Sequence, residues 1–165
     1  MATKKKTTSK KAPTKKVPKK AMKKVTAKSA RKRRASDVPN LFRLNLEVGN
    51  LDQAAEFYSK LFGLEGRKQA GSRCYFNCGP VTLQVVDVSS VGKPHPAAKA
   101  LYFTVNDLDA VFARAKALGC LSGEDVHGVS GGSISVRPWG ERSFYAEDKW
   151  QNPLCFVEAG TIYPG

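Results

Sequence analysis

Residues 1–36 contain no acidic and no aromatic residue, yet they carry 16 of the 28 lysines and arginines in this 165-residue chain. Residues 37–165 hold 12 basic and 14 acidic side chains, a net charge of −2. The formal charge of +14 therefore belongs to one end of the chain. This asymmetry excludes a uniformly basic globular protein and predicts a near-neutral domain preceded by a cationic arm.

Long apolar runs are also missing, because none approaches the roughly 18 residues that a membrane-spanning helix needs. The lysine-rich start has no apolar segment of the kind that a secretory signal contains. We therefore expect a cytoplasmic protein that does not associate with membranes. Four cysteines are too few for a disulfide scaffold, and we expect them to be reduced thiols.

The arm, residues 1–38, consists almost entirely of Lys, Arg, Ala, Thr, Ser and Pro. Its charges repel one another and it has little apolar surface to bury, so we expect it to be disordered. In composition it resembles the tails of linker histones and of some bacterial nucleoid proteins. Lysine clusters without aromatic residues favour non-specific, salt-dependent contact with nucleic-acid phosphates, at the nucleoid or, through the basic run 28–34, in a nucleus. The alternative is a solvated extension without a partner.

The rest of the chain, residues 39–165, has the length of one domain. Alternating apolar residues predict a strand at 41–48 with one buried face. Asn50 is placed to cap a helix that ends at Gly63, with Gln53 as its capping-box partner. Short strands are then expected at about 64–69, 73–78 and 81–88.

A second copy of this pattern begins near Ala100. A strand is predicted at 101–105, followed by a helix that Asp107 caps and Gly119 ends. Further strands are expected near 132–137, 142–147 and 153–159. At an offset of 57 residues the copies match at Leu44 and Leu101, Val48 and Val105, Leu51 and Leu108, Asp52 and Asp109, and Leu61 and Leu118.

This internal repeat predicts an α+β fold of two tandem βαβββ modules, at about 41–88 and 100–160. The helices should cover one face of a cupped mixed sheet, which leaves the other face free to curl around a ligand.

Three stretches in the predicted domain resemble the signatures of the vicinal oxygen chelate superfamily. They run from Leu46 to Leu64, from Phe103 to Gly119 and from Pro138 to Glu158; in the third, Lys149-Trp-Gln-Asn152 replaces the usual Pro-x-Gly-Asn turn. This superfamily includes glyoxalase I, extradiol dioxygenases, fosfomycin-resistance enzymes and bleomycin-resistance binding proteins. The resemblance implies two βαβββ modules that form a cup, and assembly as a homodimer.

Enzymes of this superfamily typically bind a divalent cation with His and Glu at four points, on the first and last strand of each module. The resemblance places these points at Arg43, Gln84, Ala100 and Cys155. Arginine is itself a cation, alanine has no donor atom and glutamine offers only a neutral oxygen, so one cysteine remains as a good ligand. We therefore expect no metal site and no other cofactor.

Strand parity gives the residues expected to line the cup, which suit a small polar or planar ligand. They are Arg43, Asn45, Gln84, Tyr102, Thr104 and Cys155, with Trp139 and Arg142 at the edge. Arg43 would pair with an anionic group, Trp139 would stack on the ligand and Arg142 would clamp it. The alternatives are an ion pair of Arg43 with Glu47, edge packing of Trp139 beside a solvated Arg142, and a buried inert Cys155.

No nucleophile–base pair and no carboxylate pair stands out, so no catalytic residue is assigned. His127 is either an acid–base group at the cup mouth or an exposed loop histidine. We predict a metal-independent small-molecule-binding protein. The alternatives are a lyase, isomerase or dioxygenase with a substituted metal site, and a nucleic-acid-associated protein that uses its arm.

Overall fold

Strand β1 (Arg43–Val48) opens the regular structure of the computed structural model, which describes residues 39–164. Leu46 and Val48 are buried, whereas Arg43 and Asn45 are exposed, so the predicted alternation is confirmed for the second half of the strand. The strand begins two residues later than predicted, and Leu44, expected on the buried face, is exposed. The predicted arm at 1–38 lies outside the described residues.

Helix α2 (Leu51–Phe62) begins at the predicted cap. The Asn50 side chain accepts a hydrogen bond from the Gln53 N–H at 2.9 Å. At the other end Gly63 has a φ of 67°, and its N–H donates to the Ser59 carbonyl. The capping box is wrong, because the Gln53 side chain accepts a hydrogen bond from Lys149 instead of returning to the Asn50 N–H.

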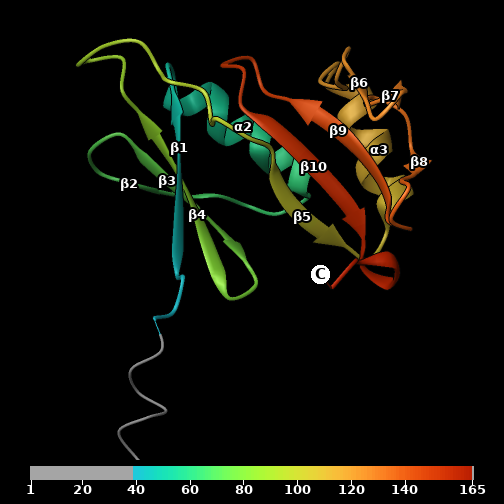
Figure 1. The fold of residues 1–165 in the computed structure, drawn as a ribbon. Coiled ribbons are helices and arrows are strands. Elements are labelled where there is room, and N and C mark those ends of the chain that lie inside the picture. Colours follow the sequence, from blue (N-terminus) through green and yellow to red (C-terminus); the bar gives the residue numbers. More distant parts are fainter. Residues whose placement is uncertain (1–38, 165) are drawn as a thin grey trace, which may run out of the picture. The chain divides into compact units, whose positions relative to one another are not determined.

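Three further strands complete module 1: β2 (Arg67–Gln69), β3 (Arg73–Cys78) and β4 (Val81–Asp87). With β1 they form sheet 1, in the order β1-β4-β3-β2. Strand β1 pairs with β4 in parallel and the other pairs are antiparallel, so the sheet is mixed, as predicted. Strand β1 lies at an edge of the sheet (Figure 1).

Module 2 repeats this plan with β5 (Leu101–Val105), α3 (Leu108–Ala117), β8 (Ser135–Val136), β9 (Arg142–Glu147) and β10 (Pro153–Glu158). Sheet 2 has the equivalent order β5-β10-β9-β8, with β5 at an edge and parallel to β10. Asp107 caps α3 by accepting from the Ala110 N–H at 2.9 Å. A short 3₁₀ turn, η1 (Ala159–Thr161), follows β10.

A two-stranded ribbon of β6 (Asp125–Val126) and β7 (Val129–Ser130) lies between α3 and β8. The sequence analysis missed it, because strands of two residues are too short to show an alternating pattern. Module 2 is therefore a βαβββ unit with this ribbon inserted ahead of its last three strands.

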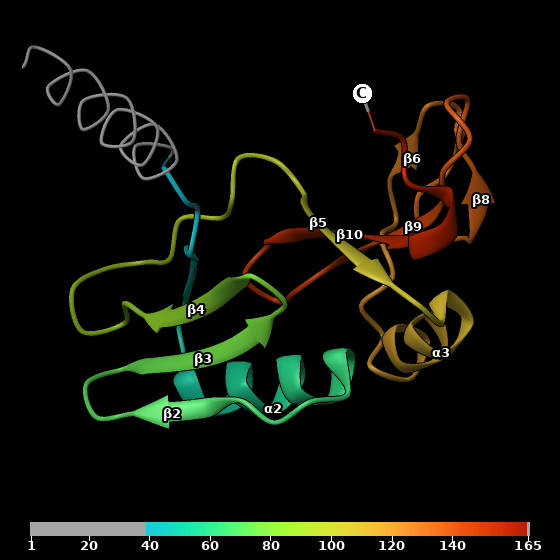
Figure 2. The ribbon, with the colours of Figure 1, turned by 90° about the horizontal axis from the view of Figure 1, so that it is seen from below.

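The helices cover one face of each sheet, α2 on sheet 1 and α3 on sheet 2 (Figure 2). Most buried apolar side chains of both modules form one hydrophobic cluster, and Tyr145, Cys155 and Val157 form a second, smaller one. The Tyr58 hydroxyl of α2 donates to the buried Asp148 carboxylate of module 2 at 2.7 Å, and Asn152 donates to the Glu47 carbonyl of β1. The predicted α+β class, modules and cupped mixed arrangement are confirmed, with two four-stranded sheets in place of one.

No helix within residues 39–164 combines the length and apolarity that a membrane-spanning segment requires.

Candidate functional site

Each sheet has a face turned away from its helix, called here the far face. In sheet 1, Leu83 and Val85 enter the core, so Gln84 between them lies on the far face. Gln84 pairs in register with Asn45 on β1 and with Tyr75 on β3. Three neighbouring strands thus place an amide, a second amide and a phenol in one row across the far face.

Two arginines converge on the Tyr75 ring. The guanidinium carbon of Arg43 lies 5.3 Å from the ring centroid and that of Arg67 lies 5.8 Å away. Arg67 is directly opposite Tyr75 on β2. Arg43 also lies 5.2 Å from the ring of exposed Phe42. Sequence reasoning found Arg43 and missed Tyr75 and Arg67, although the alternation of β3 around buried Cys74 and Phe76 places Tyr75 on this face.

The ion pair of Arg43 with Glu47, which was one alternative, does not form. The Glu47 carboxylate instead accepts from the His95 N–H at 2.9 Å and contacts its Nδ1 at 3.0 Å. The hydrogen bond from the His95 backbone is the main cause that lowers the pKa of Glu47. Within residues 39–164, no carboxylate lies within ion-pair distance of Arg43 or Arg67.

The far face of sheet 2 carries a matching row. Cys155 on β10 pairs in register with Tyr102 on β5 and with Tyr145 on β9. The hydroxyls of Tyr102 and Tyr145 lie 3.1 Å apart. Cys155 is fully buried, and burial raises the pKa of its thiol to about 11. The thiol is therefore protonated near neutral pH and is a poor nucleophile and metal ligand.

Arg137 is the main residue of this face that the sequence analysis missed. Its guanidinium carbon lies 5.1 Å from the centroid of the Tyr145 ring, and the side chain is only 2% exposed. It donates to the Ser143 hydroxyl and carbonyl and to the Val126 carbonyl. These are neutral acceptors, and they tie the β6–β7 ribbon to sheet 2.

Trp139 lies just beyond Arg137. Its indole N–H donates to the Glu141 carboxylate at 2.7 Å, and its ring makes an edge contact with exposed His127, with centroids 4.9 Å apart. The segment 122–141, called here the cover segment, therefore brings an aromatic residue and a histidine together beside the far face of sheet 2.

Arg142 does not join these residues. It shares the parity of Phe144, whose ring is in the core, so its side chain lies on the helix side of sheet 2. There it makes ion pairs with Asp109 at 3.0 Å and Glu158 at 2.8 Å. Its partners explain why it is unsuited to clamp a ligand on the far face.

The predicted ligand residues thus fall into two groups on different sheets. Sheet 1 holds Arg43, Asn45 and Gln84, and sheet 2 holds Tyr102, Thr104 and Cys155. No hydrogen bond, ion pair or ring contact among the described residues connects the two groups.

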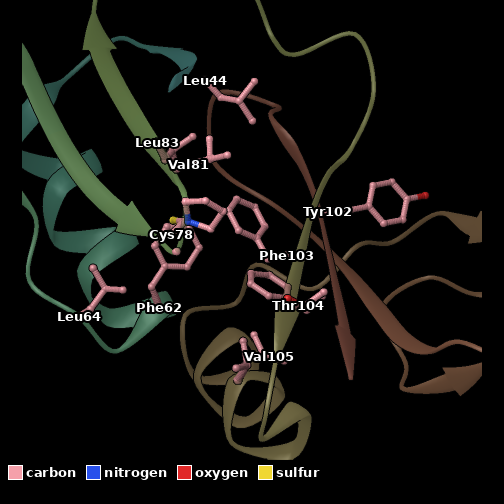
Figure 3. Close-up of a pocket in the computed structure, with 14 residues that line it drawn as sticks. Leu44, Phe62, Leu64, Cys78, Val81, Leu83, Tyr102, Phe103, Thr104 and Val105 are labelled. Atoms are coloured by element: carbon pink, nitrogen blue, oxygen red, sulfur yellow. The ribbon is translucent and has the colours of Figure 1, made fainter. Parts of the chain in front are cut away.

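A cavity of about 460 Å³ lies between the C-terminal end of α2, the edge of sheet 1 and strand β5 (Figure 3). Its lining is mostly apolar, with Phe62, Leu83 and Phe103 pointing toward one another. Of the predicted ligand residues only Tyr102 and Thr104 border it, and the Tyr102 hydroxyl points away. The cavity therefore offers few polar groups that would orient a ligand.

The four points where this kind of fold would bind a metal do not carry a suitable donor set. Arg43 is cationic and Ala100 has no donor atom, while Gln84 is neutral and Cys155 is a buried, protonated thiol. Within residues 39–164 no three or more His, Cys, Asp or Glu side chains are grouped so that they could hold a metal ion.

A family model, the glyoxalase/bleomycin resistance protein/dioxygenase superfamily, matches residues 40–156. This chain belongs to that superfamily. The match extends from the strand that bears Arg43 to the strand that bears Cys155, and so includes both far faces. A search of curated proteins finds no match.

Solved structures confirm the fold. The chain is similar to an oxidase, ChaP-H1, with 22% identity and a TM-score of 0.63, covering 78% of this chain and 100% of that one. It is similar to lactoylglutathione lyase from Agrobacterium tumefaciens, with 23% identity, a TM-score of 0.52, and coverage of 74% and 96%. A bleomycin-binding protein complexed with bleomycin shows 16% identity, a TM-score of 0.53, and coverage of 73% and 98%. Identities this low establish the shared fold.

Proposed function

We propose that this superfamily member is a metal-independent small-molecule-binding protein. The observation that carries the proposal is the donor set at the four chelate points, which has a cation at one point and no donor at another. Metal-assisted chemistry of a lyase, isomerase or dioxygenase requires anionic or imidazole ligands there. A binding role needs only a shaped face with a few polar groups. A solved protein of similar fold is a bleomycin-binding protein in complex with bleomycin.

The residues proposed to contact the ligand are those of the two far faces. On sheet 1 they are Arg43, Asn45 and Gln84, and on sheet 2 they are Tyr102 and Thr104, with Trp139 at the border. Cys155 is left out because it is fully buried. Arg142 is left out because Asp109 and Glu158 hold it on the helix side.

Metal content and ligand binding test this proposal together. Protein purified without a histidine tag is dialysed against zinc, nickel, manganese and ferrous ions, and its metal content is measured by elemental mass spectrometry. We expect metal far below one ion per chain, and we expect a library of small polar and planar compounds to yield ligands that raise the melting temperature. Stoichiometric metal would instead favour the enzyme, with turnover of a thiohemiacetal, epoxide or catechol as the next assay.

A homodimer is part of the proposal. Strands β1 and β5 are sheet edges, and apolar or aromatic side chains lie exposed on or beside them, with Leu41, Phe42 and Tyr102 about 60% exposed. A second copy of the chain would cover these edges. The far face of sheet 1 in one chain would then lie next to the far face of sheet 2 in the other chain. Light scattering coupled to gel filtration should report twice the chain mass, and a monomer at high concentration would contradict this part.

The arm supports a second role, non-specific nucleic-acid contact in the cytoplasm or at a nucleoid. Residues 1–36 of the arm carry 16 basic residues and no acid, and this is the observation that favours this role. Affinity for random duplex DNA should fall strongly with salt and should be lost when residues 1–36 are removed. Equal DNA affinity of the truncated and full-length proteins would disprove the role.

A further inference from the structure

Two like charges meet on the far face of sheet 1 without a counter-charge. The guanidinium groups of Arg43 and Arg67 converge on the one ring of Tyr75. The ion pairs found within residues 39–164 involve other side chains throughout. Strands β1 and β2 are the opposite edges of sheet 1, so the two arginines reach the Tyr75 ring from opposite sides of β3. An anion bound beside this ring would be attracted to both guanidinium groups.

Gln84 provides an independent observation at the same place. Its side chain is only 7% exposed, yet it makes no hydrogen bond to any described residue. Among residues 39–164, every side-chain nitrogen or oxygen that is sealed from solvent has a hydrogen-bond partner. Because the Gln84 carboxamide has no such partner, it must remain open to solvent on the far face. The Gln84 amide is therefore free to exchange water for an oxygen of a bound molecule.

The geometry also indicates the size of the bound molecule. Arg67, Tyr75 and Gln84 occupy one cross-strand row, and Arg43 reaches the same ring. A nucleic-acid strand is instead followed by cationic groups spaced along a groove. Arg73, the other arginine of this face, lies at the far end of β3, where it donates to the Gly71 carbonyl. Two cationic groups gathered around one tyrosine ring suit a single small anion better than a long polyanion.

The chemistry of these residues indicates the class of ligand. Guanidinium groups bind carboxylate, phosphate and sulfonate oxygens in a forked arrangement and stack on aromatic planes. The rings of Phe42 and Tyr75 flank Arg43 and offer apolar area for a planar group. The Gln84 amide can donate to an oxygen of the same anion.

We infer that the far face of sheet 1 binds a small aromatic oxyanion, with Arg43 and Arg67 holding the anionic group beside Tyr75 and Gln84 completing its hydrogen bonds. This inference rests on the proposed small-molecule function and specifies its ligand class.

A matched pair of probes tests the inference on the full-length protein. Naphthoate and its uncharged isostere naphthamide are titrated at low ionic strength, and binding is measured by calorimetry. We expect naphthoate to bind at least about tenfold more tightly than naphthamide, because only the former gains charge-assisted hydrogen bonds. Arg43→Gln and Arg67→Gln should each weaken naphthoate binding about tenfold and leave naphthamide unchanged.

Arg73→Gln is the control, since it removes the same charge from the same face without touching Tyr75. It should change naphthoate affinity by less than about twofold, since long-range charge effects are screened. All three arginines are exposed, so thermal melting should show that the variants remain folded.

The failures of the two proposals can be told apart. Equal binding of naphthoate and naphthamide overturns the anion site and leaves small-molecule binding intact. An equal loss in all three arginine variants also overturns the site, because general electrostatics then suffices. The anion site is also overturned if naphthoate does not bind, or if only an oligonucleotide displaces bound naphthoate. The small-molecule function fails only if the wider compound library yields no ligand.

Discussion

Both modules place an arginine against a tyrosine on the far face of their sheet, but the two pairs differ in burial. In module 2, Arg137, which is itself part of the cover segment, and Tyr145 are both buried, and neutral oxygens accept hydrogen bonds from the guanidinium group. In module 1, Arg67 is exposed and lies beside Tyr75 without an ion-pair partner in the described chain. The same two residue types therefore serve stability in one module and remain open to a ligand in the other.

The inserted ribbon accounts for this difference. Module 2 has the cover segment between α3 and β9, and its Val126 packs on Tyr145 and Cys155 and accepts from Arg137. Module 1 connects α2 to its strands within a few residues and has no such cover. The arginine–tyrosine pair of module 2 is therefore buried by the inserted residues, whereas the pair of module 1 stays accessible to solvent.

Removing the guanidinium from each module should give the largest contrast. Arg137→Ala should lower the free energy of unfolding by about 3 kcal/mol, because it leaves a cavity and unpaired oxygens at Ser143 and Val126. Arg67→Ala should cost less than about 0.5 kcal/mol, because the side chain is exposed. Urea unfolding of both variants measures the difference. If both lose the same free energy of unfolding, the arginine–tyrosine pair of module 2 is no more structural than that of module 1.

Cys155 and Gln84, the central residues of the two rows, should differ in how they affect the pH dependence of the free energy of unfolding. The Cys155 thiol ionises near 9.0 when unfolded and near 11 when folded, so the unfolded state holds fewer protons in that window. Stability from this group is full below about pH 9 and is lost as the pH rises toward 11. Cys155→Ala should flatten the decline of the free energy of unfolding across this window.

Gln84→Ala is the matched change in module 1, and it should leave the pH dependence as it is in the wild type, since an amide does not titrate. If Cys155→Ala also leaves the slope unchanged, the thiol of Cys155 is not buried as described.

Removing a tyrosine hydroxyl from each module should give a smaller difference in stability between the two modules. Tyr145→Phe removes the contact with the Tyr102 hydroxyl and should cost about 1 kcal/mol. Tyr75→Phe removes a hydroxyl without a partner among the described residues and should cost less than about 0.5 kcal/mol. Thermal melting under identical conditions compares the two, and the reverse order would refute the assignment of roles.

The helix caps should show no contrast. Asn50 and Asp107 each accept one backbone N–H at 2.9 Å, at equivalent places in the repeat. Asn50→Ala and Asp107→Ala should therefore each cost about 1 kcal/mol. Urea unfolding of these two variants checks that the modules behave alike where their local geometry is alike; a several-fold difference would mean that the repeat does not extend to its caps.

Local signals in the sequence were sufficient for much of the fold. The alternation around Leu46 and Val48 predicted β1, and Asn50 and Gly63 marked both ends of α2, because caps and strand parity depend on a few neighbouring residues. The β6–β7 ribbon was missed because its pairing is only two residues long.

The candidate site was harder to predict, because it depends on which strands are neighbours. Arg67 and Tyr75 meet across two strands, and Arg137 reaches Tyr145 from the end of β8, neither of which shows as a motif. Arg142 was an avoidable error, since it has the parity of the core residue Phe144.

The central claim is that the arginine–tyrosine pair of module 1 is open to an anion and that of module 2 is closed. Nuclear magnetic resonance of the arginine Nε–H groups during a naphthoate titration tests it directly. The account predicts that the Arg43 and Arg67 signals shift with saturation while the Arg137 signal stays in place and exchanges slowly with solvent. A shift confined to Arg137, or no shift at any of the three, would contradict it.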